Sequence, residues 1–297
     1  APFAALEFDG RGGDDTLDVQ SDAPGAIGEA IGFAGGEGND RLNVSSTWSG
    51  AQAWFVQFGQ IFGPLLPLLQ YSGTEDLTLT TGAGDDDVLV RTPQARAVVS
   101  GGEGRDTLEV WSAELAVTLR GQGGDDRIEL GEPVSGDGDV LAGLRGAITV
   151  EGGDGVDSLD IDNGGDVAYR TGGLTDNLLA GFGLGVDGVR YGTVESLHLA
   201  LGSGQDELAI WDTSATTMVD MGGGPDRLEL FGNQKPLTVT QSAGGSLFAN
   251  LGGLVFYRDS ILGGMRAQVT LDGGGNASSQ LVVRNEGDPA HNDGVVS

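Results

Sequence analysis

Apolar and polar residues alternate in short runs along the chain, and glycine-rich turns separate the runs. In "GGEGRDTLEV" (residues 101–110), Leu108 and Val110 alternate with polar residues directly after a turn that carries Asp106. Val99, two residues before the stretch, belongs to an earlier alternating run. Alternation with period two is typical of a β-strand with one buried face. The stretch therefore predicts a strand, a glycine turn and a second strand.

The same pattern recurs in eight windows of ten residues, which is the signature of a repeat architecture. The windows begin at Gly10, Gly35, Thr81, Gly101, Gly121, Gly152, Leu201 and Met221. Position four is always glycine: Gly13, Gly38, Gly84, Gly104, Gly124, Gly155, Gly204 and Gly224. Position six is always aspartate: Asp15, Asp40, Asp86, Asp106, Asp126, Asp157, Asp206 and Asp226. Positions eight and ten are always aliphatic, and the residue two before each window is apolar.

The spacing of the windows predicts how the strands are arranged. Asp86, Asp106 and Asp126 are 20 residues apart, and so are Asp206 and Asp226. Twenty residues hold two short strands and two turns, which is one coil of a parallel β-solenoid, with apolar residues inside each coil and polar residues outside. At roughly 20–30 residues per coil we expect about ten to fourteen coils and an elongated rod.

A longer period lies over the short one. Residues 71–90 match residues 191–210 at an offset of 120, and residues 159–173 are echoed by residues 281–295 at an offset of 122. We therefore expect one continuous solenoid segment over residues 1–297, built from blocks of about 120 residues. The blocks run approximately over 40–160 and 161–282, and residues 283–297 begin another, as in a longer array.

Charge and composition limit which partners and which functions the chain can have. The 44 acids against 15 bases give a net charge of −29, which disfavours nucleic acid and anionic membranes as partners and favours cations. Of the 44 acids, 21 lie in the eight windows, more clustering than salt adaptation or solubility would produce. With no cysteine there is no disulfide framework. The chain shows no signal peptide, and the uncharged stretch 42–74 is too interrupted by Gln, Gly and Pro for a membrane span.

The windows resemble the hemolysin-type calcium-binding (RTX) nonapeptide repeat, G-G-x-G-x-D followed by x-aliphatic-x. Gly101, Gly102, Gly104 and Asp106 match its pattern position by position. The resemblance implies a right-handed parallel β-roll in which motif aspartates and turn carbonyls of successive turns enclose Ca²⁺. It assigns a metal-ligand role to the eight aspartates at position six and to turn glycines. These are Asp15, Asp40, Asp86, Asp106, Asp126, Asp157, Asp206, Asp226, Gly82, Gly84, Gly102, Gly104, Gly121, Gly124, Gly202, Gly204, Gly222 and Gly224.

Electrostatics independently favours a hard cation in these turns. Stacked coils would place the aspartates about 4.8 Å apart, where two like charges repel by roughly 3–4 kcal/mol at an effective dielectric near 20. Ca²⁺ takes six to eight oxygen ligands, both carboxylate and carbonyl, whereas a chain without cysteine and with two histidines does not suit Zn²⁺ or Cu²⁺. The alternative is a glycine turn with a capping aspartate and no metal.

The chain departs from the family pattern in ways that limit which turns are strong candidates for a calcium site. Because one motif recurs every 20 residues or more, we expect one calcium-bearing edge of the solenoid and one plain edge. The intervals 40–86, 157–206 and 226–297 hold long insertions, and Ser279 stands where the register requires aspartate. The strongest candidate sites lie between the pairs 86/106, 106/126 and 206/226.

Two other features bear on function. The apolar segment 54–71 is either a docking or carbohydrate-contact patch or, as we prefer, a loop or short helix that covers a coil edge. His198 should face solvent and His291 lies in a polar loop, so no Ser–His–Asp constellation can be assembled. Carboxylate pairs such as Asp14 and Asp15 could suggest glycosidase chemistry, but they repeat from turn to turn where a catalytic pair should be unique.

The sequence thus predicts a calcium-binding, non-catalytic structural segment of a larger secreted or cell-surface protein, acting as a rod, spacer or adhesin-type scaffold. Calcium binding would be coupled to folding. Its expected partners are Ca²⁺ and other copies or flanking domains of the same protein, while a carbohydrate or protein ligand stays unidentified. The alternative is a calcium-dependent polysaccharide lyase or epimerase on a parallel β-helix, which would need a basic residue beside the metal in a groove.

Overall fold

The computed structural model is an all-β structure. It describes residues 6–64, 66–132, 140–242, 245–251, 265–274, 279–283 and 294–296. Within these residues the only helical element is the short 3₁₀ turn η1 (Leu141–Gly143), and no helix is long and apolar enough to cross a membrane. The chain forms two compact units, one of residues 1–131 and 143–158 and the other of residues 132–142 and 159–297. The division at 158/159 falls beside the block boundary that the sequence predicts near residue 160.

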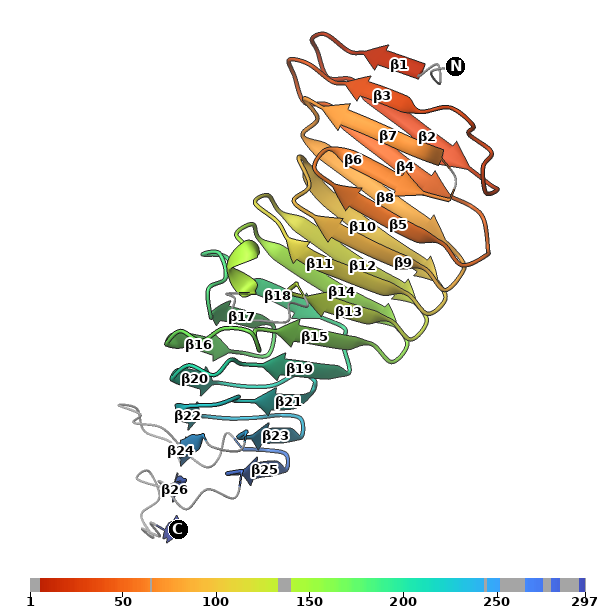
Figure 1. The fold of residues 1–297 in the computed structure, drawn as a ribbon. Helices are drawn as coiled ribbons and strands as arrows, with labels where there is room; N and C mark the ends of the chain where they lie inside the picture. Colours follow the sequence, from red (N-terminus) through yellow and green to blue (C-terminus); the bar gives the residue numbers. More distant parts are fainter. Residues whose placement is uncertain are drawn as a thin grey trace. The chain divides into compact units, whose positions relative to one another are not determined.

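The first unit consists of two sheets in which most neighbouring strands are parallel (Figure 1). Its first sheet has the order β1 (Leu6–Asp9), β3 (Ile31–Ala34), β7 (Leu66–Ser72), β6 (Gln60–Gly63), β5 (Ala53–Gln57), β9 (Asp87–Arg91), β11 (Thr107–Ser112) and β13 (Arg127–Leu130). Its second sheet has the order β2 (Thr16–Ser21), β4 (Arg41–Ser46), β8 (Asp76–Gly82), β10 (Arg96–Glu103), β12 (Val117–Gly123) and β14 (Ile148–Asp154).

The second unit repeats this arrangement. One sheet has the order β15 (Ser158–Asp162), β19 (Ser196–Ala200), β21 (Thr216–Asp220), β23 (Leu237–Thr240) and β25 (Val269–Asp272). The other has the order β18 (Val189–Gly192), β17 (Leu178–Gly181), β16 (Arg170–Leu174), β20 (Asp206–Ile210), β22 (Pro225–Leu230), β24 (Ser246–Leu251), β26 (Gln280–Val283) and β27 (Gly294–Val296).

The chain passes from one sheet to the other at most turns, and the strand pairing follows the predicted period. In the second sheet of the first unit, Ala97 of β10 pairs in parallel with Leu77 of β8 and with Val117 of β12, in each case 20 residues away. The pairing from β12 to β14 advances by 31 residues, from Val117 to Ile148. An alternating path of parallel strands is consistent with a β-helix or solenoid-like fold.

The alternation of apolar residues explains why these segments are strands. From the second window to the eighth, the aliphatic residues at positions eight and ten are buried, as for Leu108, Val110, Ile128 and Leu130, none more than 1 % exposed. The residue two before the turn is buried in the same way, as Val99 and Leu119 are. The sequence prediction of an inward apolar face and an outward polar face is confirmed for these windows.

The apolar segment 54–71 is neither a covering loop nor a short helix, and that prediction is wrong. It forms β5, β6 and β7, with β6 antiparallel to both neighbours through the pairs Phe55–Phe62 and Ile61–Leu69. In Figure 1 these strands lie between β3 and β9, with which β7 and β5 pair in parallel. Strand alternation in "AWFVQ" and the two-residue turn at Phe58 allow the chain to reverse within the sheet.

A similar three-strand reversal occurs in the second unit. Strands β16, β17 and β18 are joined by the antiparallel pairs Gly173–Ala180 and Leu179–Val189. Phe182, which follows β17, is 1 % exposed and lies over Gly172, where a Cβ atom would collide with its ring. In both units, therefore, a reversal of three strands lengthens one sheet by two strands without interrupting the other.

Replacing a core residue should test the predicted interior. Leu119 is fully buried and pairs with Val99 and Val150 on the neighbouring strands. We expect Leu119→Ala to lower the free energy of unfolding by about 2–5 kcal/mol, because it removes apolar burial and leaves a cavity. Urea denaturation followed by circular dichroism measures the change. The outward-facing Thr118→Ala serves as the control, and an equal effect of both substitutions would contradict the assigned facing of β12.

Candidate metal centre

Four motif aspartates of the first unit form a continuous hydrogen-bonded ladder. The backbone N–H of Asp86 donates to the Oδ1 of Asp106 at 2.8 Å, and the N–H of Asp106 donates to the Oδ1 of Asp126 at 2.8 Å. The N–H of Asp126 donates to the Oδ1 of Asp157 at 2.9 Å. At the other end, the N–H of Gln52 donates to the Oδ1 of Asp86 at 2.7 Å. We call these five residues the long ladder; its four carboxylates are all buried.

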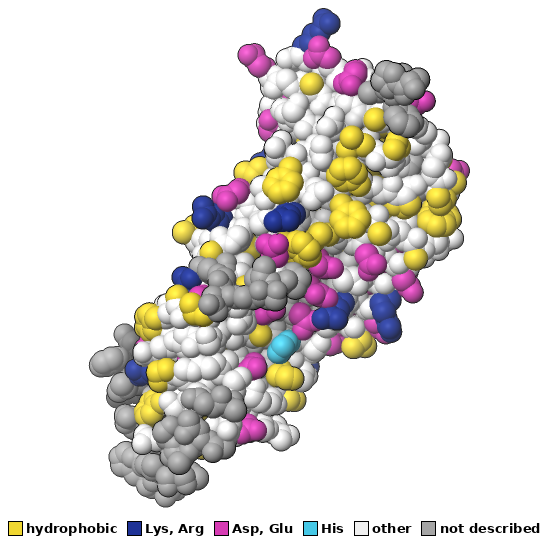
Figure 2. Space-filling model, viewed as in Figure 1, with side chains coloured by type: hydrophobic (Ala, Val, Ile, Leu, Met, Phe, Trp, Pro, Cys, Tyr) yellow, Lys and Arg dark blue, Asp and Glu magenta, His cyan; other side chains and the backbone are white. Residues whose placement is uncertain are grey.

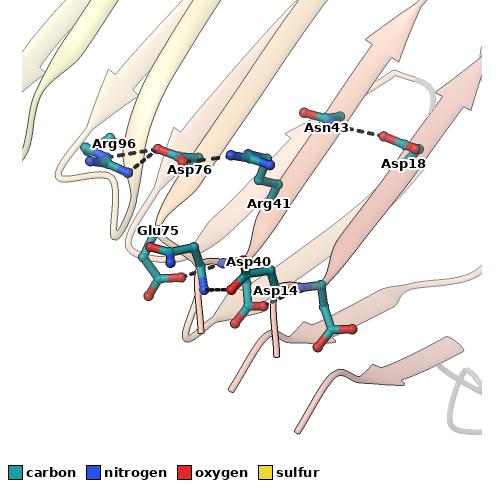
Figure 3. Close-up of polar contacts among 10 residues, drawn as sticks. Asp14, Asp18, Asp40, Arg41, Asn43, Glu75, Asp76 and Arg96 are labelled. Atoms are coloured by element: carbon teal, nitrogen blue, oxygen red, sulfur yellow. Dashed lines mark hydrogen bonds and ion pairs between the residues drawn. The ribbon is translucent and has the colours of Figure 1, made fainter. Parts of the chain in front are cut away.

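The first two motif aspartates form a separate short ladder. The N–H of Asp15 donates to the Oδ1 of Asp40 at 2.8 Å, and the N–H of Asp40 donates to the Oε2 of Glu75 at 2.7 Å. Figure 3 shows the side chains of Asp40 and Glu75 at neighbouring turns. On the adjoining strands, Asp76 lies between two arginines, at 2.9 Å from Arg96 Nε and 3.9 Å from Arg41 Nε.

The two ladders lie at opposite edges of the first unit. The turn of Asp40 runs from the first sheet (β3) to the second (β4), whereas the turn of Asp86 runs from the second sheet (β8) to the first (β9). The expectation of one motif-bearing edge and one plain edge is therefore wrong for this unit. The physical reason is the path between the two turns: β4, the β5–β7 reversal and β8 make three half-coils, whereas 20 residues make two.

The second unit holds a third ladder. The N–H of Asp206 donates to the Oδ1 of Asp226 at 2.8 Å, and the N–H of Arg170 donates to the Oδ1 of Asp206 at 3.2 Å. The second carboxylate oxygen of Asp226 accepts a hydrogen bond from Gln241 Nε2 at 2.8 Å. The pairs 86/106, 106/126 and 206/226 that the sequence singles out are thus brought together.

Sequence reasoning missed several members of these ladders. Glu75, which accepts in the short ladder, and Arg170, which donates in the third, lie at turns without the glycine pattern, and only the strand register identifies them. Asp166 is paired with the side chain of Arg170. The N–H of Ser203 donates to the backbone oxygen of Asp166 at 2.8 Å, which places Asp166 one coil from the Asp206 turn. Where Ser279 replaces the motif aspartate, its Oγ accepts from the N–H of Leu247 at 3.3 Å, so the hydroxyl takes over the ladder role.

An outer ladder runs beside the inner ones at position five of the motif. Asp14, Asp85 and Asp125 each accept, through Oδ1, the backbone N–H of the position-five residue one coil further on, at 2.9–3.0 Å. The doublet Asp-Asp in three of the windows is the sequence signal for this arrangement. In the doublets Asp85–Asp86 and Asp125–Asp126, each carboxylate therefore has its own backbone donor in a different ladder.

The motif glycines are required by the close stacking of turns. A Cβ atom on Gly102 would collide with the carbonyl oxygen of Gly82, and one on Gly104 would lie 2.5 Å from that of Gly84. Both Gly102 and Gly104 also have positive φ values, 105° and 127°. The same close approach to the preceding coil's carbonyl holds for Gly124, Gly222 and Gly224, whose neighbours are Gly104, Gly202 and Gly204.

Four of the inner carboxylates have one oxygen in a cradle formed by glycine. The Oδ2 atoms of Asp15, Asp40, Asp106 and Asp126 are buried and accept no hydrogen bond in the described part of the chain. Each lies against the first residue of its own window, where a Cβ atom would overlap it: Gly10, Gly35, Gly101 and Gly121. At three of these positions the same space is lined by a carbonyl oxygen of the next coil, from Gly35, Gly73 and Gly152.

Burial shifts the titration of the ladder carboxylates. Loss of solvent raises the pKa of Asp106 to about 7, and hydrogen bonding from the Asp86 N–H only partly offsets this rise. The pKa values of Asp126 and Asp206 are raised to about 6 by burial and by the neighbouring ladder carboxylates. Asp166 differs: burial raises its pKa, but the hydrogen bonds and charge of Arg170 bring it below the usual value. Asp106, Asp126 and Asp206 therefore ionise less readily than an exposed aspartate.

The oxygen atoms at each ladder suit a hard cation, but the carboxylates alone are too few to surround one. Unpartnered carboxylate oxygens and glycine carbonyls are the ligands that Ca²⁺ accepts. Among the described residues, however, no group of three or more His, Cys, Asp and Glu side chains is close enough to hold a metal ion. A calcium ion at a ladder would therefore take one carboxylate per turn and draw its other ligands from backbone oxygens and solvent.

Comparison with known proteins adds no relative: neither the protein-family models nor the curated proteins contain a match to this chain. The resemblance to RTX repeats consequently depends on the motif residues alone. Of the two histidines, His198 is 43 % exposed as expected and lies 3.4 Å from Asp160, while His291 lies outside the described residues.

The raised pKa values predict how stability depends on pH when calcium is chelated. Between about pH 4 and pH 7, folded Asp106 retains a proton that the unfolded chain has released, because its pKa rises from 3.8 to about 7. The free energy of unfolding should therefore decrease as the pH rises through this window and increase on acidification. Thermal melts at pH 4.5, 6 and 7.5 in chelator measure this contribution. Stability that rises steadily with pH would contradict it.

Substitution of Asp106 separates its charge from its hydrogen bond. Asp106→Asn keeps an oxygen that accepts the Asp86 N–H and removes the buried charge, so at pH 7.5 in chelator we expect stability equal to or above that of the unchanged protein. Asp106→Ala leaves the N–H without an acceptor and should lower the free energy of unfolding by about 1–3 kcal/mol. Urea denaturation of both variants is the measurement. Equal destabilisation by Asn and Ala would show that the side-chain oxygen at this position does not stabilise the fold.

Proposed function

We propose that this chain is a calcium-stabilised, right-handed parallel β-solenoid of the RTX type, with a structural and non-catalytic role in a secreted or cell-surface protein. The observation that carries the proposal is the inner ladders: aspartates stacked turn on turn, of which Asp15, Asp40, Asp106 and Asp126 each hold one buried carboxylate oxygen in a glycine cradle. The repetition supports a role as rod, spacer or adhesin-type scaffold, since the same Gly-x-Asp turn recurs in eight windows.

The ladder needs positive charge, and this supports calcium as the partner. Burial raises the pKa of Asp106 to about 7 and that of Asp126 to about 6, so ionising these stacked carboxylates is unfavourable unless a cation lies beside them. Ca²⁺ would replace the proton, satisfy Oδ2 and reduce repulsion between neighbouring coils. Binding of this kind stabilises the folded state by about 2.7 kcal/mol per site at a concentration one hundred times the dissociation constant.

Coupling of binding to folding would suit an extracellular protein. Where calcium is scarce, the acidic chain carries its full repulsion and the coils are weakly held. Where calcium is in the millimolar range typical of weaker extracellular sites, the ladders fill and the coils become rigid. The net charge of −29 makes this dependence stronger, because unneutralised acids oppose compaction throughout the chain.

A calcium titration tests the proposal. At pH 7.5 we expect millimolar Ca²⁺ to raise the melting temperature well above its value in EGTA, and Mg²⁺ to have a smaller effect because it prefers a tighter octahedral shell. At pH 4.5 the calcium effect should shrink, since protons occupy the ladder. Circular dichroism gives the melts and isothermal titration calorimetry gives the number of bound ions.

Two variants provide the control. Asp106→Asn should reduce the calcium-dependent rise in melting temperature, while Asp187→Asn, at an exposed acid outside the ladders, should leave it unchanged. If exhaustive chelation leaves the melting temperature at pH 7.5 unaltered, the ladder is a purely structural hydrogen-bond device and the calcium proposal fails. If Asp187→Asn reduces the effect as much as Asp106→Asn, the response reflects general screening of charge instead of binding at the ladder.

A further inference from the structure

The outer face of four adjacent strands in the first unit carries no charge. Strands β3, β7, β6 and β5 contain no Asp, Glu, Lys, Arg or His residue, although the chain as a whole is 20 % charged with a net charge of −29. The strands lie next to one another in that order. Acidic residues would make this surface more soluble than uncharged ones do. Solubility therefore does not explain why these four strands lack charge.

A row of glutamines crosses this face. Gln70 of β7 pairs with Gln60 of β6, and Gln60 pairs with Gln57 of β5, so the three amides occupy neighbouring strands at one level. Within the described residues none of the three amide side chains hydrogen-bonds to protein, so their donors and acceptors face solvent. Gly32 of β3 continues the row opposite Gln70.

A surface groove of about 270 Å³ lies over this row. Its lining includes Glu7, Gly32, Gln60, Gln70, Phe58 and Gly59. A Cβ atom at Gly32 would overlap the carboxylate of Glu7, so glycine allows that carboxylate to lie at the end of the groove. The lining therefore includes two amides, one carboxylate and the exposed ring of Phe58.

Exposed aromatic rings accompany the amides. Phe55 of β5 is 44 % exposed and Phe58 is 53 % exposed. The guanidinium of Arg91 lies 5.8 Å from the Phe58 ring centre and 5.9 Å from the Trp111 ring centre, so both rings contact the same cation. On the face seen in Figure 2, hydrophobic side chains gather in the part of the molecule that holds β5, β6 and β7.

Phe58 is held in a backbone conformation that its side chain disfavours. It occupies the first position of the two-residue turn between β5 and β6 with φ of +49°, followed by Gly59 with φ of +74°. Asparagine is the residue preferred at this position of such a turn, whereas a bulky side chain is strained there. Strain retained at an exposed aromatic residue points to a role other than folding. In the second unit, by contrast, Phe182 has φ of +52° but is buried, where packing explains its presence.

We propose that the outer face of β3, β7, β6 and β5 binds a neutral polysaccharide. Amides supply both donors and acceptors for sugar hydroxyls, and aromatic rings supply apolar surfaces for the C–H faces of the sugar ring. Strands spaced at about 4.8 Å present one such group per strand to a chain that runs across them.

The charge of the protein selects the ligand class. The net charge of −29 repels anionic polysaccharides and nucleic acids, while the uncharged face imposes no cost on a neutral chain. A groove of this size along a narrow row of amides fits a single polymer strand. A folded protein partner would need about 800 Å² of contact surface on each side. The motif aspartates take no part in this site, so the inference is independent of calcium binding at the ladders.

Affinity gel electrophoresis in calcium buffer tests the inference. The protein is run through gels containing hydroxyethylcellulose, glucomannan, laminarin or dextran, with alginate as the anionic comparison. We expect retardation by at least one neutral polymer and none by alginate. Phe58→Asn should weaken the retardation about tenfold while leaving the melting temperature unchanged or raised, because Asn suits the turn. Gln60→Glu, which places a charge in the row, should abolish retardation.

Tyr169→Asn is the matched control, since Tyr169 is 55 % exposed but lies in the second unit. It should migrate as the unchanged protein does. Absence of retardation in every neutral gel overturns the inference, as does retardation by alginate alone. Sedimentation velocity tests whether the face instead joins two copies of the chain. A dimer that Gln60→Glu dissociates, without retardation by any polymer, would show such self-association and would overturn the inference.

Discussion

The structure depends on one repeated contact, the hydrogen bond from a backbone N–H in one turn to a carboxylate oxygen in the turn of the next coil. It fixes the height of each turn relative to its neighbour, so strands on both sides enter their sheets in register, as β8, β10 and β12 do at steps of 20 residues. Because the acceptor is buried and charged, the bond is short and directional. It also concentrates acids where burial disfavours their ionisation.

This tension between alignment and charge connects the fold to the proposed function. A neutral residue at position six would align the turns without repulsion, as Ser279 does for Leu247. Aspartate instead leaves each ladder dependent on protons or a cation. In the second unit, two protein side chains reduce the cost of burying acids: Arg170 forms an ion pair with Asp166, and Gln241 donates a hydrogen bond to Asp226.

The reversals β5–β7 and β16–β18 show how a repetitive chain acquires distinct surfaces. Each lengthens one sheet by two strands, and in the first unit the reversal also moves the motif turns from one edge to the other. The same insertion supplies the uncharged strands with their glutamine row. A solenoid-like chain can thus gain a binding face without changing the turns that align its coils, because inserted strands pair within the sheet and leave the neighbouring ladder contacts intact.

The sequence by itself determined the period, the strands and the inward-facing residues, because alternation with period two and the fixed Gly-x-Asp turn recur at each window. Position-six aspartates were recognisable for the same reason. Only the tertiary structure decided which edge each turn occupies, since a tight turn such as Phe58–Gly59 keeps the chain in one sheet while a longer turn carries it to the other. It also revealed Gln52, Glu75 and Arg170, whose ladder role comes from register between residues 34 to 36 positions apart, a distance that local patterns do not encode.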